Sequence, residues 1–219
     1  MAVFLNSLIL AFSALLPVVN PLGSALIFLG FVGHAPPEAY RALARKVAST
    51  TVLFLLIIEL VGAALLTFFA ISLPVVQLAG GLVVAAMGWK LLNSDDKNGN
   101  GQQASVQTNF GPLEDKIFYP LTFPITSGPG CIVVTLTLSA HASQRAILGN
   151  FAAHLGIAAA IVVLGFLVAI SYAYAPRITQ KIAPQTVHGI LRVIAFVLLC
   201  IGVQIAKNGL EAMIQAAPR

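Results

Sequence analysis

The chain has 219 residues, of which 58% are hydrophobic and only 9% are charged. Soluble domains carry about 25% charged residues because their surface must be hydrated, so this composition excludes an ordinary water-soluble fold. The net charge of +5 does not indicate nucleic-acid binding, because Lys and Arg are confined to short segments between apolar runs. The composition predicts an all-α, polytopic protein whose solvent is the lipid bilayer.

Six stretches of the sequence are candidates for membrane-spanning helices. Such a helix needs about 20 mostly apolar residues, and the stretches that meet this requirement are residues 3–32, 48–70, 74–92, 117–140, 149–173 and 187–208. Residues 93–116 are rich in Asn, Gln, Gly and charge, which predicts a cytoplasmic linker. The linker divides the chain into two halves of three spans each, residues 1–92 and 117–219.

The distribution of basic residues predicts the orientation. Nine of the 12 Lys and Arg residues fall on one side of the six spans. Because cytoplasmic loops retain positive charge during insertion, that side faces the cytoplasm and both termini lie on the outer, periplasmic face. Trp89, Tyr172 and Tyr174 lie near basic residues at the ends of spans, which predicts that they anchor the chain at the membrane surface.

Helix-breaking residues interrupt the first span at "VVNPLG". Pro17 and Pro21 each lack a backbone N–H, and their rings clash with the preceding turn of a helix. Backbone groups freed in this way are costly in hydrocarbon, so the broken segment is expected to line a cavity or to bind a ligand. We expect Ser24 to cap the half-helix that follows.

A matching interruption, "FPITSGPG", occurs in the fourth span. Pro120 and Pro124 are again four residues apart, and Ser127 or Gly128 is predicted to cap a half-helix with Pro129 in its first turn. Corresponding breaks in two halves favour two inverted-topology repeats around a binding site in the middle of the membrane. The alternative is that both breaks are simple kinks, which are common in membrane helices.

The residues around these breaks suit an amino acid that carries no net charge. The N-terminus of a half-helix attracts an anion such as a carboxylate, and freed carbonyl groups attract an ammonium group. No Lys, Arg, Asp or Glu occurs at either break to balance a charged substrate. The sequence predicts no metal or cofactor site, and it leaves open whether the chain forms oligomers.

The segments "NPLGSALIF", "FFAISLPVVQLAGGLVVAAMGWKLL" and "FYPLTFPITSGPG" resemble the MarC family of bacterial and archaeal inner-membrane proteins. That family is similar to LysE-type exporters, and the resemblance implies transport of small neutral amino acids such as glycine or alanine, without enzymatic activity. Ala70 stands where the family pattern has a glycine. The resemblance implies that the substrate-binding residues lie at the two discontinuous helices: Asn20, Pro21, Gly23 and Ser24 in the first, and Thr126, Ser127, Gly128, Pro129 and Gly130 in the fourth.

Two ionisable residues inside the predicted spans are candidates for proton coupling. Glu59 is the one acidic residue in the middle of a span, and a carboxyl group there is a functional hypothesis because burying its charge is costly. His154 could relay protons, since imidazole titrates near neutral pH. The alternative for both residues is a structural role as hydrogen-bonded groups inside the helix bundle.

Three classes of function remain open at this stage. The first is a secondary transporter that works by alternating access, with possible proton coupling. The second is a channel or another kind of small-solute exporter, although the sequence has no ring of charges and no filter-like motif. The third is a membrane assembly subunit that transports nothing, since small residues such as Gly80 and Gly156 allow close helix packing.

Overall fold

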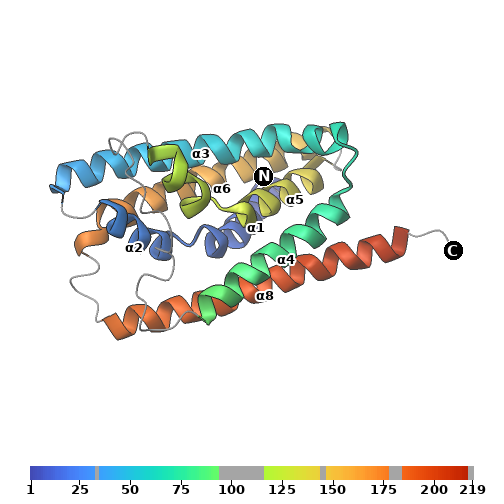
Figure 1. The fold of residues 1–219 in the computed structure, drawn as a ribbon. Helices are drawn as coiled ribbons and strands as arrows, with labels where there is room; N and C mark the ends of the chain where they lie inside the picture. The colour runs from blue at the N-terminus through green and yellow to red at the C-terminus, as the bar shows by residue number, and fades with distance from the viewer. Residues whose placement is uncertain (33–34, 94–115, 144–146, 178–183, 217–219) are drawn as a thin grey trace.

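The computed structural model describes residues 1–219 except 33–34, 94–115, 144–146, 178–183 and 217–219, and the described residues are helical without a strand. The predicted linker therefore lies almost entirely outside the described residues. Long helices run along one direction of the molecule, with shorter helices between them (Figure 1). The elements in chain order are α1 (Ala2–Val19), α2 (Pro21–Val32), α3 (Pro37–Phe68), α4 (Leu73–Leu92), η2 (Ile117–Thr126), α5 (Pro129–Ser143), α6 (Ile147–Ala173) and α8 (Pro184–Ala216).

The helices have the length and composition of membrane spans. Five helical stretches qualify by themselves, and η2 with α5 forms a sixth if the pair, bent by 71°, counts as one span. Large apolar side chains cover the outside, including Leu60, Phe68 and Leu148, which are exposed as lipid-facing residues would be. The all-helical, polytopic prediction is confirmed, although α3 and α8 extend beyond the apolar ranges expected from the sequence.

Glycine residues allow α4 and α8 to lie in backbone contact. The two helices run side by side in opposite directions along the lower edge of Figure 1. A Cβ atom on Gly81 would lie 2.3 Å from the backbone nitrogen of Ala206, and one on Gly202 would lie 2.2 Å from that of Ala85. No side chain fits in these positions, so small residues determine this interface, as is typical of helix pairs in membranes.

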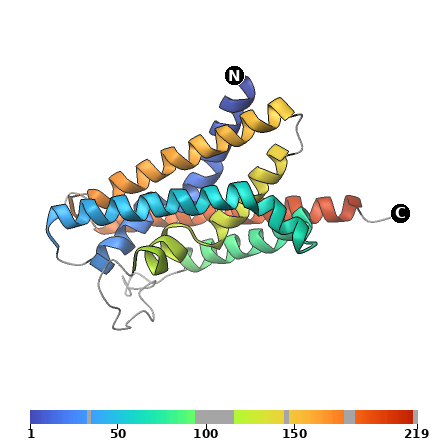
Figure 2. The ribbon, with the colours of Figure 1, turned by 90° about the horizontal axis from the view of Figure 1, so that it is seen from above.

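The buried core lies among α1, α3, α5 and α6. α6 packs along both α1 and α3, and the view from above shows α3 and α6 as long neighbouring helices with α1 crossing nearby (Figure 2). Gly156 brings the start of α6 against the backbone of Phe4 in α1, where an added Cβ would lie 2.5 Å from the Phe4 carbonyl oxygen. This packing places the end of α6 close to the first break.

Candidate functional site

The first break is formed by a single residue, Asn20, between α1 and α2. Its backbone is left-handed, with φ of 44°, a conformation that Asn adopts more readily than most residues. Its N–H donates to the Leu16 carbonyl at 3.0 Å, and its Oδ1 accepts a bond from the Gly23 N–H at 3.1 Å. Asn20 therefore ends one helix and caps the next.

Two expectations about this break were wrong in detail. Ser24 is not the cap, because its hydroxyl donates to the Asn20 carbonyl at 2.9 Å from within the first turn of α2. Pro17 does not interrupt the helix and lies inside α1. Pro21 instead occupies the first position of α2, where a missing N–H costs nothing because that N–H has no intrahelical partner.

The second break follows a wide helical segment, η2, that contains two prolines. Tyr119 and Phe123, which precede Pro120 and Pro124, have extended backbones, as expected for a residue before proline. Threonine hydroxyls take over the hydrogen bonding that the distorted backbone loses, because Thr126 donates to the Leu121 carbonyl at 2.6 Å. The Ser127 N–H donates to the Thr122 carbonyl at 2.8 Å, which closes the segment.

α5 begins directly after this segment, at Pro129. Gly128 occupies the cap position, with its carbonyl accepting the Cys131 N–H at 2.9 Å. One of the two predicted caps is therefore confirmed, and Pro129 lies in the first turn as expected. The hydroxyl oxygen of Ser127 is buried at this helix start and has no hydrogen-bond partner in the described part of the chain.

Tyr172 near the end of α6 brings the two breaks together. Its hydroxyl lies 2.7 Å from the Thr126 hydroxyl oxygen and also interacts with the Ser24 side chain. Since the one proton of the Thr126 hydroxyl is used in the bond to Leu121, the phenol donates to Thr126. The Tyr172 ring is fully buried and stacks on Phe28 of α2 at 4.4 Å between ring centroids.

This role of Tyr172 corrects the prediction that it anchors the chain at the membrane surface. Tyr174 fits that prediction, because its ring is exposed and holds the Arg177 guanidinium at 5.7 Å. Residues two positions apart on a helix point in roughly opposite directions, since each residue turns the helix by about 100°. That spacing was the available signal that the two tyrosines have different environments.

The end of α1 and the start of α5 also meet at the breaks. A Cβ atom on Gly130 would lie 2.9 Å from Cγ1 of Val18, so the last turn of α1 contacts the first turn of α5. The end of α1 presents carbonyl groups and the start of α5 presents N–H groups. The two ends carry partial charges of opposite sign.

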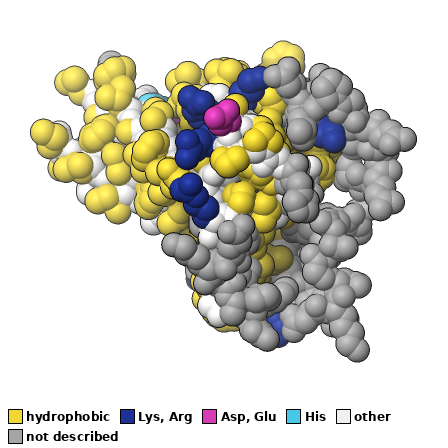
Figure 3. Space-filling model, turned by 90° about the vertical axis from the view of Figure 1, so that its left-hand side faces the viewer, with side chains coloured by type: hydrophobic (Ala, Val, Ile, Leu, Met, Phe, Trp, Pro, Cys, Tyr) yellow, Lys and Arg dark blue, Asp and Glu magenta, His cyan; other side chains and the backbone are white. Residues whose placement is uncertain are grey.

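The breaks lie nearer to the basic end of the bundle than to its middle, where we expected them. Gly128 contacts Met87, three residues before Lys90 in α4, and Tyr172 is the last residue but one of α6. Lys and Arg gather on this end of the molecule, which faces the viewer in Figure 3. Pro21 already lies past the middle of the predicted span 3–32, which agrees with a break displaced from the centre of the span.

Seven of the nine predicted substrate-binding residues are buried, and Asn20 and Pro129 are partly buried. The structure brings Ser24 and Thr126 together at the Tyr172 hydroxyl, and Ser127 is the buried residue that follows Thr126 in the chain. None of these residues is charged. The site therefore offers hydroxyl groups and backbone groups as its chemistry.

Glu59 and His154 form a second polar group, on α3 and α6. Oε1 of Glu59 bonds to Nδ1 of His154, which is 95 positions away in the chain. The Ser139 hydroxyl of α5 donates to the backbone carbonyl of Glu59 at 2.6 Å. His154 is 18 residues before Tyr172 on the same helix, or about 27 Å at 1.5 Å per residue, so this pair is separate from the breaks.

Comparison with known proteins now decides the family. A family model described as "MarC family integral membrane protein" matches residues 5–214. The chain belongs to the MarC family.

Relatives in that family are similar over nearly their whole length. The "UPF0056 membrane protein" of Pyrococcus abyssi is 26% identical over 207 residues, which cover 94% of this chain and 96% of that protein. The "UPF0056 inner membrane protein MarC" of Escherichia coli O1:K1 is 29% identical over 211 residues, with 92% of each chain covered. No solved structure matches the chain with significance. With its helical spans, the chain is a multi-pass membrane protein.

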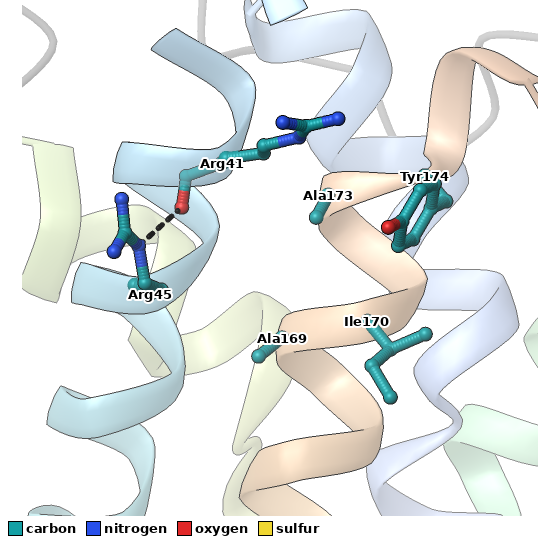
Figure 4. Close-up of a pocket in the computed structure, with 6 residues that line it drawn as sticks. All are labelled: Arg41, Arg45, Ala169, Ile170, Ala173 and Tyr174. Atoms are coloured by element: carbon teal, nitrogen blue, oxygen red, sulfur yellow. Dashed lines mark hydrogen bonds between the residues drawn. The ribbon is translucent and has the colours of Figure 1, made fainter. Parts of the chain in front are cut away.

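This MarC-family chain also has a surface hollow of about 380 Å³ between α3 and α6. Arg41 and Arg45 line it from α3, and Tyr174 lines it from α6 (Figure 4). Two guanidinium groups attract an anion and repel an ammonium group. The hollow therefore does not suit the neutral zwitterion expected from the sequence.

Proposed function

We propose that this protein carries small neutral amino acids, of the glycine or alanine type, across the cytoplasmic membrane by alternating access. The single observation that carries the proposal is the meeting of two broken helices at the buried Tyr172 hydroxyl, beside the unpartnered hydroxyl of Ser127. A buried polar atom without a partner costs about 1–3 kcal/mol, and a ligand that bonds to it recovers this energy.

The two helix ends at the breaks complement a zwitterion. The N–H groups at the start of α5 would bind the carboxylate, as helix N-termini bind anions. The carbonyl groups at the end of α1, one contact away at Val18, would bind the ammonium group. A charged side chain on the substrate would meet no counter-charge there.

The packing of helices supports an arrangement of two halves related by an inverted repeat. α4 packs on α8, α3 packs on α6 and α1 contacts α5, so helices in the same position of each predicted half contact one another. The contact of α1 with α6 also has a counterpart in that of α3 with α5. Such exchange of partners is expected of an inverted repeat, in which both termini would lie on the periplasmic face, as the distribution of basic residues predicts.

Counterflow in proteoliposomes tests the proposal. Vesicles loaded with unlabelled glycine, alanine or serine should take up the same labelled amino acid, whereas vesicles loaded with lysine or glutamate should not. Flux that does not saturate and shows no counterflow would indicate a channel. A stoichiometric partner together with no amino-acid flux would indicate an assembly subunit, and either result refutes the carrier.

Ser127→Ala tests the position of the site. Its hydroxyl has no partner among the described residues, so its removal should leave thermal stability unchanged or slightly higher. If the hydroxyl binds substrate, the half-saturation concentration should rise about tenfold, the effect of 1.4 kcal/mol. Thr135→Val is the matched control, since this buried hydroxyl on α5 is also unpartnered but lies two turns away. If the half-saturation concentration is the same for Ser127→Ala and Thr135→Val, the assigned site is refuted.

A further inference from the structure

Glu59 is buried in the middle of the bundle with half of its carboxyl group unsatisfied. The side chain is 1% exposed, and Oε1 is bonded to His154. Oε2 has no hydrogen-bond partner among the residues that the structure describes. Purely structural carboxyl groups in a low-dielectric interior normally have both oxygens satisfied. The open oxygen is therefore free to accept a proton or a hydrogen bond.

Few charged groups lie on the helices around the pair, and one of them is the N-terminal ammonium of Met1, which precedes α1, the helix whose Phe4 packs against Gly156, two residues after His154. The other ionisable side chains of α3 lie at least 13 residues away, toward its basic end. His141 of α5 is exposed and bonded to the Thr137 carbonyl of its own helix. α1 and α2 have no ionisable side chain, and the remaining ionisable residues on the helices packed around the pair are Tyr119 of η2, Cys131 of α5 and Tyr172 of α6. Glu59 and His154 are therefore bonded directly to each other and not to another described charged side chain on the same helices.

The two members of the pair differ in their access to the surroundings. The His154 side chain is 23% exposed, whereas that of Glu59 is 1% exposed. An imidazole can accept a proton on one side and pass one on through its other nitrogen. The imidazole is therefore the member of the pair nearer the surface of the bundle, and in the proposal below protons reach the carboxyl group through it.

α5 connects the pair to the second break. The Ser139 hydroxyl, near the end of α5, donates to the Glu59 carbonyl at 2.6 Å. A turn further along α3, a Cβ on Gly62 would lie 2.0 Å from Leu136 of α5, so the helices are in close contact. The other end of α5 is the half-helix start at Gly128 and Pro129. A shift of α5 when the substrate binds would therefore change the surroundings of Glu59.

We propose that Glu59 and His154 form the proton-binding site that couples proton movement to amino-acid transport, an inference that depends on the proposed transport function. With Nε2 of His154 protonated and one further proton held between Oε1 and Nδ1, the carboxylate and the imidazolium together are neutral. An additional proton binds at Oε2 and gives the pair one positive charge, and the same proton leaves when α5 returns. The substrate has no net charge, so each cycle moves one proton and one positive charge across the membrane.

A pH gradient across proteoliposomes tests this role, with the membrane potential clamped by potassium and valinomycin. If one proton moves with each substrate molecule, a gradient of one pH unit should concentrate the labelled amino acid about tenfold inside the vesicles. This accumulation should occur for only one direction of the gradient. Glu59→Gln should abolish this accumulation and keep counterflow, because exchange needs no net proton movement. Glu38→Gln and His141→Gln are matched controls at exposed positions, and both should accumulate substrate as the wild type does.

The outcomes separate the two proposals. A wild type without counterflow refutes the transport function and the coupling role together. A wild type that exchanges but does not accumulate, or a Glu59→Gln variant that accumulates normally, refutes the coupling role alone. If Glu59→Gln does not fold, His154→Gln undergoes the same test, and proton uptake or release by the wild type on adding substrate is measured with a pH indicator. Absence of any proton change would also refute the coupling role.

Discussion

Replacing Tyr172 with phenylalanine removes the hydroxyl that connects the two breaks and keeps the ring that stacks on Phe28. Thr126 still donates to the Leu121 carbonyl in the variant, so no donor is left without an acceptor. Ser24 likewise keeps its own bond to the Asn20 carbonyl, so the expected loss is mainly that of the bond that the phenol donates to Thr126, about 1 kcal/mol. In a chain of this length, that corresponds to a decrease in Tm of about 2–4 °C.

The same loss should affect substrate binding. If binding requires both breaks to be held at one point, then destabilising that arrangement by about 1 kcal/mol weakens the apparent affinity about fivefold. Thermal unfolding in detergent and the half-saturation concentration for counterflow measure the two effects. Tyr174→Phe is the matched control, because this exposed tyrosine lies on the other side of the same stretch. If both variants melt and exchange alike, Tyr172 does not connect the breaks and the reasoning is wrong.

Two further predictions concern stability. Ala70 has a left-handed backbone with φ of 52°, and this conformation costs about 1–2 kcal/mol for a residue with a Cβ. Ala70→Gly should therefore raise the Tm by a few degrees. An unchanged or lower Tm would contradict this conformation. Gly202→Ala places a Cβ 2.2 Å from the Ala85 nitrogen and should destabilise the α4–α8 pair by about 1–3 kcal/mol. Gly189→Ala on the same helix meets nothing within 4 Å; if it lowers the Tm as much as Gly202→Ala does, close packing is not the cause.

The positions of both breaks could be predicted because they depend on local chemistry. Pro21 and Pro129 lack the N–H that would bond to the preceding turn, and unlike Pro17, which lies inside α1, each is next to a residue that can cap a helix. The family pattern likewise indicated a glycine at position 70, and the structure shows the left-handed backbone that favours one there. The choice of Asn20 over Ser24 as the cap was less predictable, since both residue types are good caps.

The composition and the lengths of the apolar runs by themselves determined that this chain is a helical membrane protein with two interrupted helices. Only the tertiary structure decided that Tyr172 connects Ser24 with Thr126, that Glu59 pairs with His154, and that α4 packs on α8. The physical reason is that lipid leaves little polar contrast around a helix. In α4, for example, apolar residues surround the whole helix, so the sequence does not show which face turns inward. That choice depends on glycines that fit against a backbone and on polar groups that find partners far away in the chain.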